Sequence, residues 1–282
     1  MLAIPRAEFA VIGGSGTFKI NFPEDLAVDG EDSGAGDLPG INVLAAGLVL
    51  ETPFGKSPPL KLFAAGEKRV LTVKMHGWRG GVARADASRQ LFWVFREAGV
   101  KKIIAEGGVG AVSHLFRIRD VVLPSDYLDF SLRKDVRLSD QYLLAMRQAV
   151  CPEIKEALKE AARRQYVRVF DRGVYAVTDG RHFESPAEVA MLRILGADVV
   201  GQSMCPEVYL AREIGACYAR LDIVVNYAEG VVEDWRHEDL KDIFHTEGKR
   251  IGRVVLAALG SLDAAQDCGC PQLRYPTLLT EE

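Results

Sequence analysis

Short runs of β-branched and aliphatic residues alternate along this chain with longer segments in which apolar residues recur at helical spacing. This alternation constrains the fold most, because strands that alternate with helices favour a parallel sheet covered by helices on both faces. We therefore predict an α/β fold with a central, mixed and mostly parallel sheet flanked by helices. The predicted strands are 9–12, 69–73, 102–105, 120–123, 173–177, 199–200 and 219–225, and the predicted helices are 84–98, 141–165, 186–195, 206–214 and 239–259.

The chain of 282 residues is longer than a usual single domain, but α/β domains of this size build one continuous core. Neither an internal repeat nor a low-complexity linker divides it, so we predict one domain over residues 1–282. Residues 28–40 are acidic and glycine-rich with almost nothing to bury, which indicates a mobile loop. Residues 263–282 are expected to form a C-terminal tail.

Charge and hydropathy exclude two classes of partner. The formal net charge is −4, so the clustered basic surface of a nucleic-acid-binding protein is not indicated. No apolar run approaches the roughly 20 residues that a membrane helix needs, so we expect no membrane contact. The apolar N-terminal run ends at Gly13 without a basic leader or cleavage site, and it is typical of a first strand rather than a signal peptide.

The five cysteines are too few and too scattered for a disulfide scaffold, which favours a cytoplasmic location. Two of them, Cys268 and Cys270, flank a single glycine near the C-terminus. Such thiols can form a redox pair or half of a metal site. Because neither a histidine nor a second cysteine pair lies nearby in the sequence, we interpret them as part of a solvated tail and expect no metal.

Four segments with hydrogen-bond donors follow predicted strands, at the edge of a parallel sheet where sites lie. The glycine turn 13–16 offers backbone N–H groups and a serine hydroxyl, and Lys74 and His76 follow the next strand. The glycine-rich segment 106–110 follows a third strand, and Ser203 lies close to a helix N-terminus. Each segment also has a structural interpretation, as a tight turn, a core histidine or a helix cap. Four of them together favour a phosphate-sized site.

A second group of residues, Phe183, Glu184 and Asn226, suits a purine with a carbonyl at C6. The aromatic ring supplies a stacking surface, the carboxylate accepts the ring N–H, and the amide both donates and accepts along the remaining edge. The sequence therefore predicts a pocket that binds a purine next to an oxyanion.

These segments, in this order from Phe9 to Leu259, resemble the trimeric purine nucleoside phosphorylase and methylthioadenosine phosphorylase family. The segments that carry the resemblance are 13–16, 52–56, 74–76, 106–112, 180–188, 196–198, 206–208 and 217–219. The resemblance implies a homotrimer that cleaves purine nucleosides with phosphate in purine salvage, giving a free purine and a pentose 1-phosphate. It implies no cofactor, with inorganic phosphate as the co-substrate.

Carried over residue by residue, the resemblance also assigns roles. Phosphate would lie against five groups, which are Ser15, Lys74, His76, the Gly108 N–H and Ser203. The backbone of Gln202 would lie beside the pentose, and the purine would stack on Phe183 between Glu184 and Asn226. The implied catalytic residues are His76 and Asn226, because Asn226 would donate to purine N7 or O6 as negative charge accumulates there.

The base preference follows from two side chains. Adenine-specific members of the family resemble one another in an Asp-x-Asp at the position of Asn226 to Ala228, and neither acid is present here. An amide opposite N7 and O6, with Glu184 facing N1–H, favours hypoxanthine or guanine. With adenine, the N1 lone pair would face the Glu184 carboxylate, so that two acceptors oppose each other. The mismatch would cost about 1–3 kcal/mol of binding free energy for each unpaired group.

Several departures from the family keep other functions open. Lys74 stands where members usually carry arginine, which loses two-point contact with phosphate, and Glu106 places an acid near the anion. Arg181 and His182 have no assigned role. A nucleoside hydrolase, with water in place of phosphate, is therefore one alternative, and a non-catalytic nucleoside-binding protein is another.

The 5′ end of the nucleoside is the least constrained. His237 is the one candidate to contact it, although a solvated residue at a helix start is the alternative interpretation. Inosine, guanosine and methylthioinosine all stay open as substrates.

Overall fold

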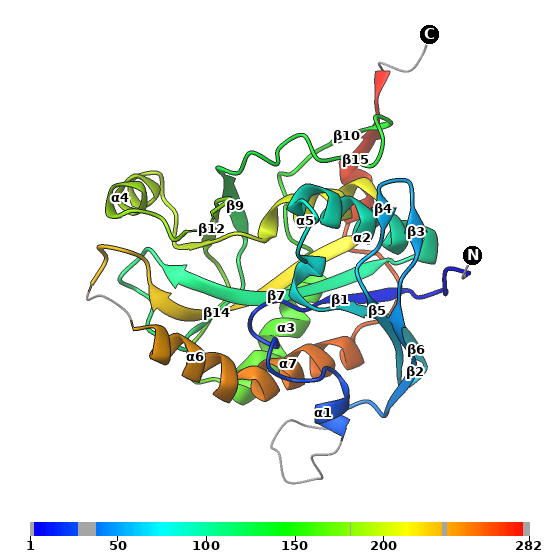
Figure 1. Ribbon diagram of the computed structural model, residues 1–282, viewed down its shortest axis with the longest axis horizontal. Coiled ribbons are helices and arrows are strands. Elements are labelled where there is room, and N and C mark those ends of the chain that lie inside the picture. Colours follow the sequence, from blue (N-terminus) through cyan, green and yellow to red (C-terminus); the bar gives the residue numbers. More distant parts are fainter. Residues whose placement is uncertain (1–2, 28–37, 181, 233–235, 279–282) are drawn as a thin grey trace.

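The computed structural model describes residues 3–27, 38–180, 182–232 and 236–278, and four parallel strands form its centre (Figure 1). Along the sheet they follow the order β14-β7-β1-β6, and they are buried on both faces over most of their length. Continuous burial explains their nearly unbroken apolar sequences. Their bounds are β1 (Phe9–Ile12), β6 (Lys68–Val73), β7 (Lys102–Ala111) and β14 (Cys217–Tyr227).

Antiparallel strands extend this centre at both edges. β5 (Leu60–Ala65) pairs with β6, and β2 (Ile41–Leu48) pairs with β5. At the other edge, β8 (Val121–Val122) runs antiparallel to β14 and β11 (Val169–Phe170) runs parallel to β8. The predicted α/β fold with a mixed, mostly parallel sheet is confirmed.

A branch of the sheet leaves the main path at the far end of β7. There β13 (Val199–Gly201) pairs antiparallel with β7, and β12 (Val174–Val177) lies between β13 and β9 (Asp126–Asp129). A small apolar cluster under α4 (Pro186–Ile194) packs against this branch. The branch carries Gly180 and residues 182–184 toward the end of β14, and this brings two distant parts of the chain to one cavity.

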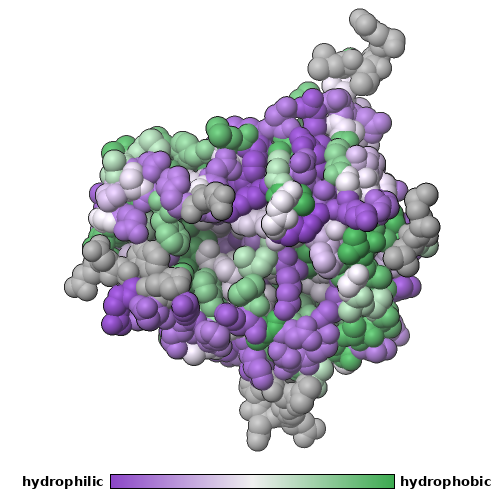
Figure 2. All heavy atoms as spheres, viewed as in Figure 1, coloured by the Kyte–Doolittle hydropathy of each residue, from purple (hydrophilic) through white to green (hydrophobic). Residues whose placement is uncertain are grey.

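Helices cover both faces of the sheet, as Figure 1 shows. α2 (Arg84–Ala98) and α5 (Met204–Glu213) pack together on one face, and α3 (Pro152–Gln165) and α7 (Gly248–Ser261) pack together on the other. α6 (His237–Thr246) continues the second layer, and its outward surface is hydrophilic in Figure 2 while Ile243 is buried beneath it. The remaining short elements are α1 (Glu24–Ala27), β3 (Glu51–Thr52), β4 (Gly55–Lys56), β10 (Tyr142–Leu144), β15 (Arg274–Pro276) and the 3₁₀ turns Met75–Gly77 and Cys270–Leu273.

The local sequence explains where the helices begin and end. α3 and α4 both start with proline at their first position, and Ser185 and Glu188 cap α4 reciprocally. α2 ends at Gly99, whose φ of 82° closes the helix in the left-handed region. Among the described residues, no helix is both long enough and apolar enough to cross a bilayer.

Two predicted helices are wrong in extent. The helix predicted over 141–165 begins only at Pro152, and residues 142–144 instead form β10, which pairs with β15. The segment predicted as one helix over 239–259 is two helices that meet at Glu247. β2 and β5 were not predicted, because irregular pairing interrupts the alternation of β2 between Val43 and Leu48.

The two terminal predictions have different outcomes. Of the loop predicted over 28–40, residues 28–37 lie outside the described part of the chain. The solvated tail is wrong, because Cys270, Leu273 and Thr277 are buried and β15 joins β10 in a two-stranded sheet.

Candidate active site

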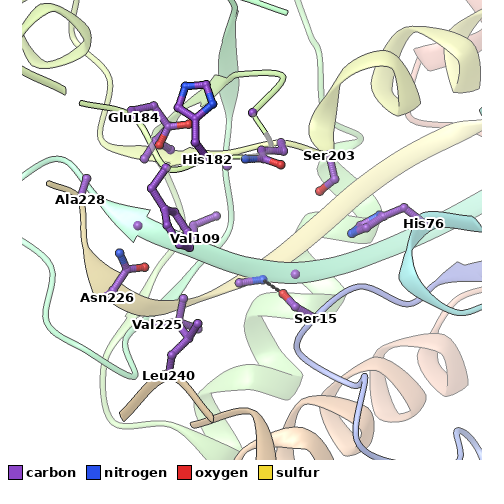
Figure 3. A pocket seen from close by; sticks show the side chains of 18 of the residues that line it. Ser15, His76, Val109, His182, Glu184, Ser203, Val225, Asn226, Ala228 and Leu240 are labelled. Atoms are coloured by element: carbon purple, nitrogen blue, oxygen red, sulfur yellow. Dashed lines mark hydrogen bonds between the residues drawn. The ribbon is translucent and has the colours of Figure 1, made fainter. Parts of the chain in front are cut away.

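A cavity of about 390 Å³ opens along β7 and at the carboxyl ends of the neighbouring strands (Figure 3). Its walls come from the turn after β1, the turn after β6, the start of α5, the end of β14 and α6. Eight of the residues that the sequence singled out line this one space. They are Ser15, His76, Gly108, Phe183, Glu184, Gln202, Ser203 and Asn226.

The segment 106–110 lies within β7 and is not a turn after a strand, so this detail of the prediction is wrong. The other part of the prediction holds: because its glycines have no side chains, the cavity extends to the backbone of β7. The Gly108 N–H donates to the Ser15 hydroxyl at 2.9 Å. A Cβ on Gly108 would lie only 3.0 Å from that hydroxyl oxygen, so a side chain here would displace the serine.

Glu106 occupies the inner side of the glycine turn. Its Oε1 accepts the Gly14 N–H and, at 2.6 Å, the Thr17 hydroxyl, while its Oε2 is buried without a hydrogen-bond partner. The N–H groups of the turn were predicted to point at a bound anion. This is wrong for Gly14, whose N–H points at Glu106. Complete burial raises the pKa of Glu106 despite these hydrogen bonds, which favours the neutral acid. The carboxyl is turned toward Gly14 and Thr17, and its raised pKa lowers the fraction of ionised acid that would repel an anion in the cavity.

His76 is held in place by a chain of buried groups. Its Nδ1 lies 2.7 Å from Glu207 Oε1, and Glu207 Oε2 accepts the Tyr218 hydroxyl at 2.9 Å. The carboxylate favours a proton on Nδ1 and orients the ring. Met75 and His76 both adopt left-handed backbone conformations, with φ of 48° and 56°, which cost about 1–3 kcal/mol each. The fold accepts this strain where it places the imidazole on the cavity wall.

Ser203 is backed by a buried ion pair. Its hydroxyl accepts from Arg220 Nη2 at 3.1 Å, and Arg220 in turn binds Asp222 through two hydrogen bonds of 2.7 and 2.5 Å. Arg220 and Asp222 are completely buried. The guanidinium also lies 4.7 Å from the centre of the Tyr175 ring. The Arg220 guanidinium thus holds the hydroxyl of Ser203 in place, and the Asp222 carboxylate balances the charge of the guanidinium.

Lys74 does not join the other predicted residues. Its ammonium group donates to the Ile20 carbonyl at 2.9 Å, and it lines a neighbouring cavity of about 400 Å³. The prediction that Lys74 and His76 emerge on one side of an extended chain is wrong, because the chain turns into the left-handed region directly after Lys74. Met75 lines the main cavity beside His76 instead.

Arg84 brings a permanent positive charge to the cavity wall. Its guanidinium donates to Gln202 Oε1 at 2.8 Å and to the Asp179 carbonyl at 3.1 Å, and it stacks 4.0 Å from the centre of the Trp78 ring. This role was not predicted, because Arg84 opens an ordinary amphipathic helix.

Glu184 and Asn226 lie at the other end of the cavity, on different walls (Figure 3). Glu184 Oε1 accepts the Thr178 hydroxyl at 2.5 Å, and the Asn226 amide donates to the Tyr227 carbonyl at 2.9 Å. Both side chains are buried, whereas Phe183 is half-exposed at the rim. Both side chains line the same cavity, so one ligand in it can meet the carboxylate with one edge and the amide with another.

Three further residues from the sequence have different outcomes. His182 lines the cavity, with no hydrogen bond to Glu184 or Asn226 among the described contacts. Arg181 and the side chain of His237 lie outside the described part of the structure. The wall next to the start of α6 is formed by Leu240 and Phe244, which are apolar.

Four buried residues escaped the sequence analysis, namely Glu207, Tyr218, Arg220 and Asp222. Two of them lie in the segments 206–208 and 217–219, which contributed to the family resemblance without receiving a role. One sequence signal could have revealed Arg220 and Asp222. They are charged residues within an otherwise apolar strand, and a strand buried on both faces admits charges only when they are paired.

Comparison with known proteins decides the family. The model of the phosphorylase superfamily matches residues 35–260. The chain belongs to the phosphorylase superfamily. The resemblance stated from the sequence is therefore confirmed, as is the predicted class of enzyme.

Two curated relatives of this chain are named for different substrates. A probable S-methyl-5′-thioinosine phosphorylase of Methanopyrus kandleri is 36% identical, over 68% of this chain and 76% of its own. The 6-oxopurine nucleoside phosphorylase of Pyrococcus furiosus is 31% identical, over 78% of this chain and 88% of its own.

Solved structures agree on the fold. The methylthioadenosine phosphorylase of Schistosoma mansoni in complex with adenine has a TM-score of 0.76 at 20% identity, covering 95% of this chain and 96% of that one. A methylthioadenosine phosphorylase from an Antarctic soil metagenomic library has a TM-score of 0.69 at 21% identity, covering 90% and 85%. At this level of identity the likeness concerns the fold alone.

Proposed function

We propose that this member of the phosphorylase superfamily cleaves 6-oxopurine nucleosides with inorganic phosphate. The observation that carries the proposal is that one cavity is lined at one end by residues suited to an anion and at the other end by residues suited to a purine. Ser15, His76 and Ser203 line the first, and Glu184 and Asn226 line the second. The named activities of the relatives from Methanopyrus kandleri and Pyrococcus furiosus support the same reaction class.

The reaction exchanges one bond at the anomeric carbon for another. A phosphate oxygen forms a bond to C1′ while the bond from C1′ to purine N9 breaks, and the electron pair of that bond passes into the purine. Asn226 donates to N7 or O6 as this charge builds up, an interaction that is stronger in the transition state than in the bound substrate. The purine then takes up a proton, which completes the free base.

Glu184 sets the preference for a 6-oxopurine. A carboxylate accepts the N1–H of hypoxanthine or guanine, whereas adenine presents a lone pair at N1 to the same oxygen. The unpaired group in a buried pocket costs about 1–3 kcal/mol, which corresponds to a preference of roughly fivefold to 150-fold. The Thr178 hydroxyl bound to Glu184 Oε1 keeps the carboxylate in its acceptor role.

The 5′-methylthio form of the 6-oxopurine nucleoside is a second candidate substrate. The specific observation is that Leu240 and Phe244 contribute apolar surface to the cavity from α6. An apolar wall matches a methylthio group better than it matches a 5′-hydroxyl. Methylthioinosine is therefore proposed alongside inosine and guanosine.

One substrate panel tests the proposal. Inosine, guanosine, adenosine, methylthioadenosine and methylthioinosine are each incubated with and without phosphate, and base and pentose 1-phosphate are measured. We expect phosphate-dependent release of hypoxanthine and guanine with little release of adenine. Release without phosphate would instead identify the hydrolase alternative, and tight binding without turnover would identify the nucleoside-binding alternative.

The setting of this activity is part of the same proposal. We propose a cytoplasmic homotrimer that works in purine salvage and uses no cofactor, with phosphate as the co-substrate. The free thiols of all five cysteines support a reducing compartment. Exposed apolar side chains beside the cavity, at Phe130, Leu132 and Met191, support contact with a second subunit.

A further inference from the structure

Four of the five cysteines meet at one point, far from each other in the sequence. The sulfur atoms of Cys151, Cys217, Cys268 and Cys270 all lie within 4.8 Å of one another. Cys151 precedes α3, Cys217 begins β14, and the other two flank a glycine ahead of β15. They lie at the amino end of β14, opposite the carboxyl end that carries Asn226, so this cluster is a separate site.

We propose that these four cysteines bind one Zn²⁺ ion as a tetrahedral tetrathiolate site. Tetrahedral coordination with Zn–S bonds of about 2.3 Å places sulfur atoms about 3.8 Å apart, which the observed cluster allows with small side-chain adjustments. Cys217 and Cys268 sulfur atoms lie 3.3 Å apart, and all five cysteines of the chain carry free thiols. Four soft thiolate ligands without a histidine or carboxylate favour Zn²⁺ over hard cations.

The backbone presents the four thiols to a common centre. Gly269 has a φ of 78°, so the chain turns sharply and brings Cys268 and Cys270 to the same side. The Cys151 N–H donates to the Tyr218 carbonyl at 2.8 Å, which ties the start of α3 to β14 next to Cys217. Three separate parts of the chain are therefore held in register around the sulfur atoms.

The surroundings suit a charged metal centre. The amide of Gln266 lies 3.4 Å from Cys217 sulfur and that of Gln148 lies 3.6 Å from Cys270 sulfur, as N–H donors to thiolate ligands do around structural metals. Lys102, which is buried, pairs with Cys217 in the sheet register, and the N-terminus of α3 points at Cys151. Binding of Zn²⁺ displaces up to four thiol protons and leaves a dianionic centre beside the N-terminus of α3 and beside Lys102, whose ammonium group also pairs with Glu153 at 2.7 Å.

The role that follows is to fasten the C-terminal segment to the core. Beyond Cys270, β15 reaches β10 and Arg274 donates to the Glu213 carbonyl at 2.7 Å. Four thiolates from three chain segments close long loops through one ion, which lowers the entropy of the unfolded chain. No group that lines the nucleoside cavity belongs to the metal site, so the proposal stands apart from the proposed function.

The test starts with metal content. The full chain is purified under reducing conditions without a histidine tag, and zinc and iron are measured by inductively coupled plasma mass spectrometry. We expect about one Zn²⁺ per chain, falling below about a tenth in Cys151→Ser, Cys217→Ser and Cys270→Ser. Cys205→Ser is the matched control, because Cys205 is buried and free but lies outside the cluster, and it is expected to keep its zinc.

Two further measurements keep the proposal falsifiable where a buried variant fails to fold. Cys268→Ser alters the one half-exposed member of the cluster and is expected to lose zinc while it stays folded by circular dichroism. Exchange of the wild-type protein with Co²⁺ is expected to give the visible bands of a tetrahedral thiolate complex. Removal of the metal by a chelator is expected to lower Tm by more than about 5 °C and to expose 263–278 to protease.

Several results would overturn the site. These are wild-type protein that stays free of metal after reconstitution with ZnCl₂, stoichiometric iron in place of zinc, or disulfides among the four cysteines after thiol blocking in native protein. Loss of zinc from Cys205→Ser equal to that from the cluster variants would also contradict it.

Discussion

Substitution of Asn226 is expected to lower kcat more than substitution of any other residue of the cavity. It is buried on the cavity wall at the end of β14, and its amide donates to the Tyr227 carbonyl. Asn226→Ala removes the donor to the purine as charge develops, so kcat with inosine and phosphate is expected to fall at least ~100-fold. Steady-state kinetics measure this. Asn42→Ala, on the exposed side of β2, is the control, and near-normal turnover of Asn226→Ala would remove the residue from the mechanism.

Glu106 is expected to make stability depend on pH. Its pKa is raised above the usual value of 4.5, mainly by burial, so the folded protein holds this proton more tightly than the unfolded chain does. The corresponding stability is complete below 4.5 and is lost as pH rises through the folded-state pKa. Glu106→Gln keeps the shape and the acceptor oxygen for Gly14 and Thr17 but cannot ionise.

Glu106→Gln is therefore expected to flatten the fall of Tm with rising pH and to raise Tm near neutral pH. Thermal unfolding between about pH 5 and pH 8 checks this. Glu97→Gln, on the surface of α2, should leave the profile unchanged. A variant whose Tm falls with pH as steeply as the wild type would show that Glu106 is ionised throughout.

The residues also show what the sequence could not give. Ser15, His76 and Ser203 were identified because their segments follow strands. Glu184 and Asn226 were identified because a carboxylate and an amide suit the edge of a 6-oxopurine. Lys74 was misplaced, because the two left-handed residues after it, one a histidine and one a methionine, carry no sequence signal for that conformation. The buried partners were missed because ion pairs such as Arg220 with Asp222 depend on packing between elements that are distant in sequence.

Among the elements, β7 makes the cavity possible, because its glycines bring the backbone to the ligand. A Cβ at Gly108 would lie 3.0 Å from both Ser15 Oγ and Val225 Cγ1 and 3.1 Å from Phe244 Cε1. Gly108→Ala is therefore expected to displace Ser15 and raise the KM for phosphate about tenfold or more, since small displacements in a positioned site have large effects. Phosphate titrations at saturating nucleoside measure it.

Gly110→Ala is the matched control in the same strand. The Cβ there would meet Val200 at 3.3 Å and Ala228 at 3.5 Å, so it crowds apolar groups and not the serine hydroxyl. Its KM for phosphate is expected to stay within about twofold of the wild type. Equal effects of the two substitutions would mean that Gly108 matters only for packing.

The elements were predictable where local signals agree with burial. α2 was predicted with its observed bounds because its apolar spacing ends at Gly99, whereas the start of α3 was misjudged by eleven positions between 141 and Pro152. The apolar residues of 142–144 serve a two-stranded sheet with β15, a partner more than 100 residues away, and only the folded chain reveals that pairing.

At the scale of the whole molecule, the surface beside the cavity indicates a partner. Leu132 is 93% exposed, and its backbone N–H donates to the Asp179 carboxylate. Asp179 lines a small cavity that shares Gly180 and Glu184 with the candidate active site. An ordered, fully exposed leucine next to a ligand site is typical of an interface. We therefore expect a homotrimer in which a neighbouring subunit covers this residue.

Light scattering after size exclusion is expected to give three times the chain mass of 30.9 kDa for the wild type. Leu132→Glu places a charge in the interface and is expected to shift the protein to smaller species and to lower kcat/KM at least about tenfold, because the cavity loses its cover. Val167→Glu is the control, since Val167 is equally exposed but lies on the turn between α3 and β11. A wild-type monomer at micromolar concentration, or a trimer that Leu132→Glu leaves intact, would place the subunit contact elsewhere or remove it.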